Sequence, residues 1–193
     1  LSKTDLVTRM VIEFTSLQGI MGREYARLAG EPAAVATAIF EHYLPRFQGD
    51  MLPQTRPGMA LGLASRLDSL VGLFAVGFAP TGSADPFGLR REALGLVQML
   101  ITARQPFDLR PALQAAAQLL PAAVTERAGL QTTAPASALL TDVLAFIRDR
   151  LYGVLREEGL PHDVVTAVLA ERGFDSYQAA MAAHDLAELV KAP

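Results

Sequence analysis

The sequence predicts an all-α protein. Apolar residues recur three and four positions apart along most of its 193 residues, as one face of a helix requires. No stretch shows sustained alternation of apolar and polar residues between hairpin turns, so nothing favours β-strands. The chain also has no repeat of fixed period and no heptad array long enough for a coiled coil. It is therefore expected to fold as a set of separate packed helices.

Three helical stripes are expected in the first half of the chain. The first follows Asp5 and is loosened or ended by Gly19, and the second begins at Pro32, a residue that suits the first helical position. Turn formers over 47–57 predict a loop, and the third stripe is interleaved with small residues, so it is expected to be a central buried helix. The apolar positions are Leu6, Met10, Phe14 and Leu17; Val35, Ile39 and Tyr43; and Ala60, Leu63, Ala64, Leu67, Leu70, Val71 and Phe74.

The second half of the chain predicts several more helices. Asp85-Pro86 supplies a helix cap and then a first-turn proline, so a helix is expected from there, with Phe87 as a core anchor. A polar passage rich in Thr and Ala over 126–137 is typical of a linker. The other helices are expected over 108–120, along the apolar stripe 140–155, and from Pro161 and Ser176.

Composition excludes several classes of protein. The chain has no cysteine, which excludes disulfides and thiolate chemistry, and its net charge of -3 argues against gripping nucleic acid by bulk charge. No uninterrupted apolar stretch reaches the ~20 residues of a membrane span, and no secretory signal is present, so we expect a cytoplasmic protein. Because residue 1 stands inside a predicted helix and Pro193 follows another, we expect an excised piece of a longer polypeptide.

No catalytic or metal-ligating set is predicted from the residues themselves. His184-Asp185 is the dipeptide that names the HD metal-dependent phosphohydrolases, but that family needs further ligands from other helices, including a later aspartate that is missing here. His42 and His162 fall at helix ends, where a partly exposed imidazole needs no catalytic duty. The carboxylates are scattered, and the hydrolase elbow, dinucleotide-binding and P-loop motifs are absent.

Two adjacent arginines, Arg90 and Arg91, remain as site candidates. They fall in the first turns of a predicted helix, where cations oppose the helix dipole at a cost of ~0.3–1 kcal/mol each. Either they pair with nearby carboxylates such as Asp85 and hold the loop, or their guanidinium groups meet RNA phosphates or carboxylates of a partner. Arg46 and Arg66 are candidates to extend such a surface.

Several motifs, in order along the chain, resemble the β subunit of bacterial two-subunit glycyl-tRNA synthetase. Residues 81–95, Thr-Gly-Ser-Ala-Asp-Pro-Phe-Gly-Leu-Arg-Arg-Glu-Ala-Leu-Gly, look like its signature. Residues 3–22 are similar to its Lys-x-Asp-Leu-x-Thr-x-Met-Val-x-Glu-Phe-x-x-x-Gln-Gly-x-Met-Gly pattern. Residues 43–50 are similar to Tyr-x-Pro-Arg-Phe-x-Gly-Asp, and residues 68–72 to Asp-Thr-Leu-x-Gly. The similarity covers about the first half of the chain.

The resemblance implies an HD-domain-like multi-helix bundle with a C-terminal helical extension. Residues 1–128 would form an HD-like domain without metal ligands, because Thr4 stands in place of the histidine and Ser65 in place of the last aspartate. Residues 129–193 would lead towards an anticodon-binding domain that the chain does not include. Neither part would hold a catalytic residue, a metal or a cofactor.

The resemblance also implies partners. The α subunit of the family joins glycine to tRNA with ATP, and the β subunit engages tRNA, in an expected heterotetramer of two α and two β subunits. This chain would then be a noncatalytic module that contacts tRNA-Gly or assembles the enzyme, and Arg90, Arg91, Arg66 and Arg46 are its candidate tRNA contacts. Two alternatives stay open, a working HD phosphohydrolase and a purely structural spacer between domains.

Overall fold

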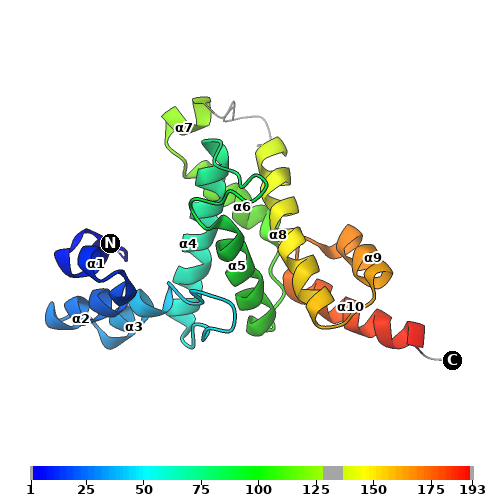
Figure 1. Cartoon of the computed structure of the whole chain (residues 1–193), viewed down its shortest axis with the longest axis horizontal. Coiled ribbons are helices and arrows are strands. Elements are labelled where there is room, and N and C mark those ends of the chain that lie inside the picture. Colours follow the sequence, from blue (N-terminus) through cyan, green and yellow to red (C-terminus); the bar gives the residue numbers. More distant parts are fainter. Residues whose placement is uncertain (1, 128–136, 192–193) are drawn as a thin grey trace. The chain divides into compact units, whose positions relative to one another are not determined.

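The computed structural model describes residues 2–127 and 137–191, and this part of the chain is all-α, as predicted (Figure 1). Within these ranges there is no strand, only an isolated bridge between Thr81 and Ala84. The elements are η1 (Thr4–Val7), α1 (Arg9–Glu13), η2 (Thr15–Leu17), α2 (Ile20–Leu28), α3 (Ala33–Glu41), α4 (Arg56–Ala75), α5 (Leu89–Ala103), α6 (Leu109–Gln118), α7 (Ala122–Arg127), α8 (Ser137–Glu157), α9 (His162–Arg172) and α10 (Ser176–Lys191).

The chain divides into two compact units, residues 1–66 and 67–193, and the division falls inside α4. The domain boundary expected near residue 128 lies outside the described residues, as does most of the expected linker over 126–137. By length and composition, α4 alone among the described helices would pass as a membrane span, and one third of its most apolar window is buried. A core helix passes the same test.

The first unit begins with three short helical turns instead of the single helix that the stripe from Leu6 to Leu17 predicts. Thr8 causes the break: its hydroxyl donates to the Asp5 carbonyl (2.7 Å) and accepts from the Val11 backbone N–H (3.4 Å). This hydroxyl ends η1 and caps α1. The rotation of the new helix buries Val11 and leaves Met10 and Phe14 of the expected stripe exposed.

Helices α2 and α3 pack against each other, and a buried carboxylate joins α3 to α4. Gly22 of α2 leaves room for the Ile39 side chain, since a Cβ at residue 22 would lie 2.8 Å from Ile39 Cγ2. Glu41, at the end of α3, accepts backbone N–H bonds from Gln54 (3.0 Å) and Thr55 (3.1 Å). The Thr55 hydroxyl also donates to Glu41 (2.5 Å), so a negative charge stands at the first turn of α4, where the helix dipole favours it.

The second unit is built around α5, which lies beside α8 and α10 (Figure 1). Six of its apolar side chains are fully buried, so α5 is the central helix of this unit, whereas the sequence favoured α4 for that place. The part of α4 that belongs to the second unit has one buried face. The buried apolar side chains of α5 are those of Leu89, Ala93, Leu96, Val97, Met99 and Leu100.

A hydrogen-bonded junction fixes the start of α6 beside the start of α10. The buried carboxylate of Asp175 accepts from the Phe107 N–H (2.8 Å) and caps α10 through the Gln178 N–H (3.0 Å). The Leu109 N–H donates to the Phe174 carbonyl (2.9 Å). Asp108 caps α6 locally, so the predicted helix over 108–120 is confirmed as Leu109–Gln118.

Candidate functional site

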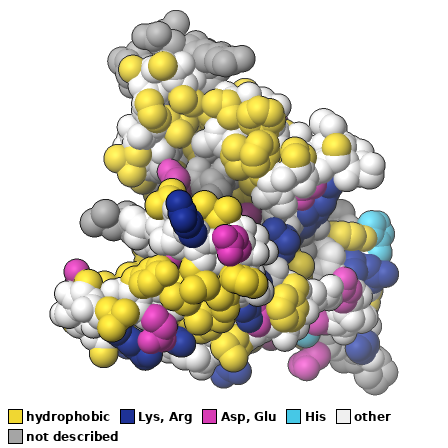
Figure 2. Space-filling model, turned by 60° about the vertical axis from the view of Figure 1, so that its left-hand side comes forward, with side chains coloured by type: hydrophobic (Ala, Val, Ile, Leu, Met, Phe, Trp, Pro, Cys, Tyr) yellow, Lys and Arg dark blue, Asp and Glu magenta, His cyan; other side chains and the backbone are white. Residues whose placement is uncertain are grey.

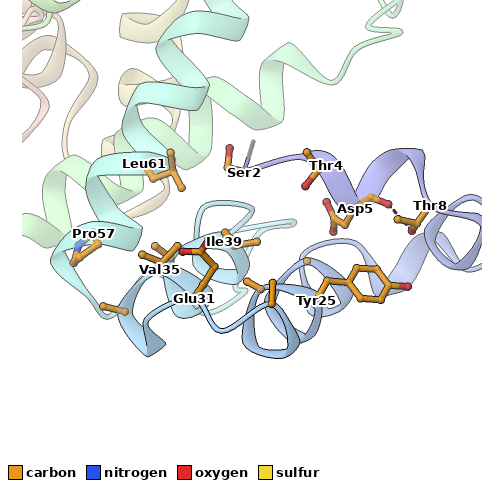
Figure 3. A pocket seen from close by; sticks show the side chains of 15 residues that line it. Ser2, Thr4, Asp5, Thr8, Tyr25, Glu31, Val35, Ile39, Pro57 and Leu61 are labelled. Atoms are coloured by element: carbon orange, nitrogen blue, oxygen red, sulfur yellow. Dashed lines mark hydrogen bonds between the residues drawn. The ribbon is translucent and has the colours of Figure 1, made fainter.

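A pocket of about 820 Å³ lies in the first unit, between the N-terminal turns, α2, α3 and the first turns of α4 (Figure 3). Its walls are mainly apolar and include alanines of α2 and α3, Ile39 of α3 and Leu61 of α4. The polar side chains along it include Thr4, Asp5 and Glu31. This pocket could not be predicted from the sequence, because its wall comes from four separate segments.

Asp5, in η1, is a structural carboxylate. It is buried, and it accepts from the Gly19 N–H (2.6 Å) and the Tyr43 hydroxyl (3.1 Å). Burial, followed by the charge of Asp5, raises the pKa of Tyr43, so this hydroxyl stays a donor. Asp5 therefore ties η1 to the start of α2 and to the chain after α3, across 14 and 38 residues.

The positions that the HD resemblance singles out lie on η1 and α4 of the first unit. Thr4 is exposed and Asp5 is committed to the two donors described above, while Ser65 lies half-buried on α4. Across the described ranges, no group of three or more His, Asp or Glu side chains is arranged to hold a metal ion.

Arg66 and Arg46, two of the candidate contacts, both hold the segment that follows α3. The Arg66 side chain is only 2% exposed, and its guanidinium donates to the carbonyls of His42 (3.0 Å) and Leu44 (2.8 Å). Arg46 is exposed and forms a two-point ion pair with Asp50 (2.8 and 3.2 Å). The hydrogen bond from the Arg46 side chain is the main reason that the pKa of Asp50 falls to about 2. Arg46 thus reaches solvent with its charge partly matched, whereas Arg66 does not reach the surface.

Arg90 and Arg91 lie at the start of α5 in the second unit and behave differently from each other. The Arg90 guanidinium donates to the Gly82 carbonyl (2.6 Å), which fastens the tip of the preceding loop to the helix. The Arg91 side chain is exposed, and its guanidinium lies over Gly88, where a Cβ would sit 2.8 Å from Nη2. Among the described residues, no hydrogen bond or ion pair is assigned to the Arg91 guanidinium.

The loop before α5 differs from its sequence prediction in one respect. Asp85 does cap the helix, through the N–H groups of Leu89 (2.7 Å) and Arg90 (2.9 Å). However, the helix begins only after Gly88, whose φ of +67° is in the left-handed region, so Phe87 stays outside the helix. Phe87 is therefore 47% exposed and is not the core anchor expected from the sequence.

The three histidines take part in local structure. His162 contacts the Tyr152 hydroxyl (2.8 Å), and His184 pairs with Glu158 (2.9 Å). His42 is buried, in contrast to the exposed helix end expected for it, and its Nδ1 donates to the Ile39 carbonyl (2.7 Å). Its Nε2 has no hydrogen-bond partner among the described residues.

This burial of His42 predicts a loss of stability on mild acidification. Burial first of all lowers the pKa of His42 below its usual 6.5. The charges of Lys3 and Arg66 act in the same direction, whereas the hydrogen bond to the Ile39 carbonyl and the charge of Asp5 oppose it. The unfolded chain therefore takes up a proton near pH 6.5 that the folded chain refuses, and stability falls with pH below that value by at most about 1.4 kcal/mol per pH unit. Urea unfolding at about pH 7.5 and about pH 5.5 measures the difference.

Two substitutions test whether His42 causes this loss of stability. His42→Gln removes the titrating group, so the gap between the two stabilities should shrink. His162→Gln, at an exposed position, should leave the gap as it is in the parent chain. An equal gap in the parent and in His42→Gln would show that another group causes the acid sensitivity.

Comparison with known proteins gives consistent similarities. A family model described as the glycyl-tRNA synthetase beta subunit matches residues 1–170. The glycine–tRNA ligase beta subunit of Desulforamulus reducens is 48% identical over 175 residues, which are 91% of this chain and 24% of that protein. The beta subunit of Myxococcus xanthus is 49% identical over 93% of this chain and 25% of its own length. The beta subunit of Syntrophomonas wolfei is 42% identical over 100% of this chain and 27% of its own length. The chain spans about a quarter of the length of these relatives.

Proposed function

We propose that this chain, which belongs to the glycyl-tRNA synthetase β-subunit family, is a noncatalytic helical module that contacts tRNA-Gly and helps to assemble the synthetase. In this proposal the α subunit uses ATP to attach glycine to tRNA, in a cytoplasmic complex of two α and two β subunits. Residues 1–128 are the HD-like domain of the proposal and residues 129–193 its extension. The chain itself supplies contacts rather than chemistry.

The loop at 81–91 is the observation that carries the proposed tRNA contact. It presents the exposed Arg91 on a framework that Arg90 and Asp85 hold in place. Both oxygens of Asp85 accept backbone N–H groups, so its charge is partly matched by the helix start. A guanidinium in this position can meet a phosphate through two parallel hydrogen bonds. Arg46 is a second proposed contact, and Arg66 acts indirectly by holding the segment that carries Arg46.

The contact predicts salt-sensitive binding of the 193-residue chain to tRNA-Gly. Each phosphate contact releases counterions, so the logarithm of the binding constant should fall linearly with the logarithm of salt concentration. Arg91→Glu should weaken binding roughly tenfold and lower the magnitude of that slope by about one. Filter binding or fluorescence anisotropy over a salt series measures both quantities.

The matched control and the alternatives give distinct results. Arg104→Glu makes the same charge change at an exposed position at the other end of α5 and should leave binding close to that of the parent. Binding that ignores both salt and Arg91→Glu would contradict the tRNA contact, and no binding at all would favour the spacer. Stoichiometric metal together with nucleotide hydrolysis would favour the HD phosphohydrolase.

A further inference from the structure

We propose that Phe78 and Phe87, with Arg91 beside them, form a stacking site for an unpaired nucleobase of RNA. The inference deepens the proposed tRNA contact and rests on it for the kind of ligand. It adds what the arginines alone do not specify, namely that single-stranded RNA is preferred over a duplex at this loop.

The two phenylalanines form an exposed aromatic pair. Phe78 follows α4, Phe87 precedes α5, and their ring centroids lie 5.0 Å apart at an angle of 61°. Their exposed fractions are 49% and 47%, so each ring packs against the other and still offers half of its surface to solvent. Single exposed apolar residues are common on proteins, but two rings in contact make a continuous aromatic surface.

The loop between the two rings is held in one conformation. Thr81 and Ala84 exchange backbone hydrogen bonds (2.9 and 3.2 Å), which closes a tight turn at Gly82 and Ser83. The turn is fastened to α5 by Arg90 through the Gly82 carbonyl (2.6 Å). A site that is already ordered pays less conformational entropy when a ligand binds, so the rings are well placed to receive a flat partner.

Charge distinguishes a nucleotide from a purely apolar partner. From Val76 to Arg91 the charged residues are Asp85, Arg90 and Arg91, and Asp85 is directed at the backbone of α5. The Arg91 guanidinium lies over Gly88, the residue next to Phe87. A cation at the helix start that follows an exposed aromatic ring suits a ligand with a planar base and an attached phosphate. Stacked bases inside a duplex cannot reach such a ring, so the ligand must be unpaired.

Figure 2 shows many apolar side chains exposed on the side of the chain that it draws. Exposed large apolar residues of the first unit include Val7, Ile12 and Leu28. Nothing in the structure shows what covers these residues. The exposed Phe47 of this unit has the Arg46 guanidinium 5.8 Å from its ring centre, but that guanidinium is already paired with Asp50. The Phe78–Phe87 pair of the second unit, by contrast, joins two exposed rings in one surface.

A tryptophan reporter tests the stacking directly. The chain contains no tryptophan, so Phe87→Trp introduces a single indole whose emission a stacked base quenches. Titration with a short single-stranded oligoadenylate should quench this emission, and a blunt RNA duplex of the same length should quench it far less. Phe14→Trp is the control, because Phe14 is similarly exposed (56%) but lies in the first unit.

Substitutions that keep or remove the ring supply the second readout. Phe87→Leu keeps an apolar side chain without a π face and should weaken binding of the oligoadenylate about tenfold, whereas Phe87→Tyr should bind like the parent. Equal binding by the Leu and Tyr variants, or equal quenching in both tryptophan variants, would overturn the stacking site.

The outcomes separate this inference from the proposed function. If tRNA binding depends on salt and on Arg91 but the Phe87 variants all bind oligoadenylate alike, the tRNA contact stands and the stacking site is wrong. If oligoadenylate quenches Phe87→Trp selectively but tRNA-Gly does not bind, the stacking site stands and the proposed tRNA contact fails.

Discussion

Replacing Arg66 with methionine is expected to lower the free energy of unfolding by about 3–5 kcal/mol. The Arg66 guanidinium is buried and donates to the carbonyls of His42, Leu44 and Pro45 (3.0, 2.8 and 3.2 Å). Without it these carbonyls lose their charged donor, and each unpaired buried group costs about 1–3 kcal/mol. Methionine keeps an unbranched apolar stem of similar reach, so the loss reports on the hydrogen bonds rather than on a cavity.

The location of Arg66 explains why lysine cannot replace it fully. The carbonyls that it meets belong to His42, the C-cap of α3, and to the segment after it, where the helix dipole places partial negative charge. The planar guanidinium reaches several of them at once, whereas an ammonium is a compact donor. Arg66→Lys should therefore lose less stability than Arg66→Met and more than a surface change.

Urea unfolding followed by far-UV circular dichroism measures the Arg66 effect. The matched control is Arg56→Met, the same substitution at an exposed position at the start of the same helix. Arg56→Met should stay within about 0.5 kcal/mol of the parent chain. If the two methionine variants unfold at the same urea concentration, the buried guanidinium does not contribute to stability as inferred.

The parts of the fold that local sequence determines were predicted well. Helix α6 carries its own cap at Asp108 and its own apolar face, and the stripe of 140–155 lies within α8, so neighbouring residues decide where these helices form. The capping role of Asp85 was also predictable, because the cap and the helix start are only four residues apart.

The parts that depend on distant residues could not be predicted. Nothing near Asp5 or Glu41 in the sequence signals burial, because their donors lie 13 to 38 residues away. Arg66 looks like any surface arginine until the carbonyls beyond α3 come to meet it. The exposure of Phe87 depends on the backbone of Gly88, whose left-handed conformation delays the helix by one turn. At this loop the sequence therefore indicated the two arginines as candidate contacts, but it did not indicate the exposed pair of Phe78 and Phe87.

Gly58→Ala is expected to destabilise the chain by about 2–3 kcal/mol, although alanine is the better helix former. Gly58 is buried in the first turn of α4, directly against the end of α3. A Cβ there would overlap Glu41 Oε2 and lie 2.7 Å from Glu41 Cβ. The Glu41 carboxylate cannot swing aside, because Gln54 and Thr55 hold both of its oxygens. The new methyl group must therefore push α3 and α4 apart or break the cap of α4.

The same substitution at Gly153 is expected to change stability in the opposite direction, so it serves as the control for Gly58→Ala. Gly153 lies in the interior of α8, and nothing stands within 4 Å of the position that a Cβ would take. Alanine there should raise stability by about 0.5–1 kcal/mol, since it removes the freedom of glycine in the unfolded chain without a clash. Urea unfolding of the two variants should thus move in opposite directions from the parent. If Gly58→Ala instead stabilises the chain as Gly153→Ala does, then α3 and α4 are not in the close contact that the buried Glu41 requires.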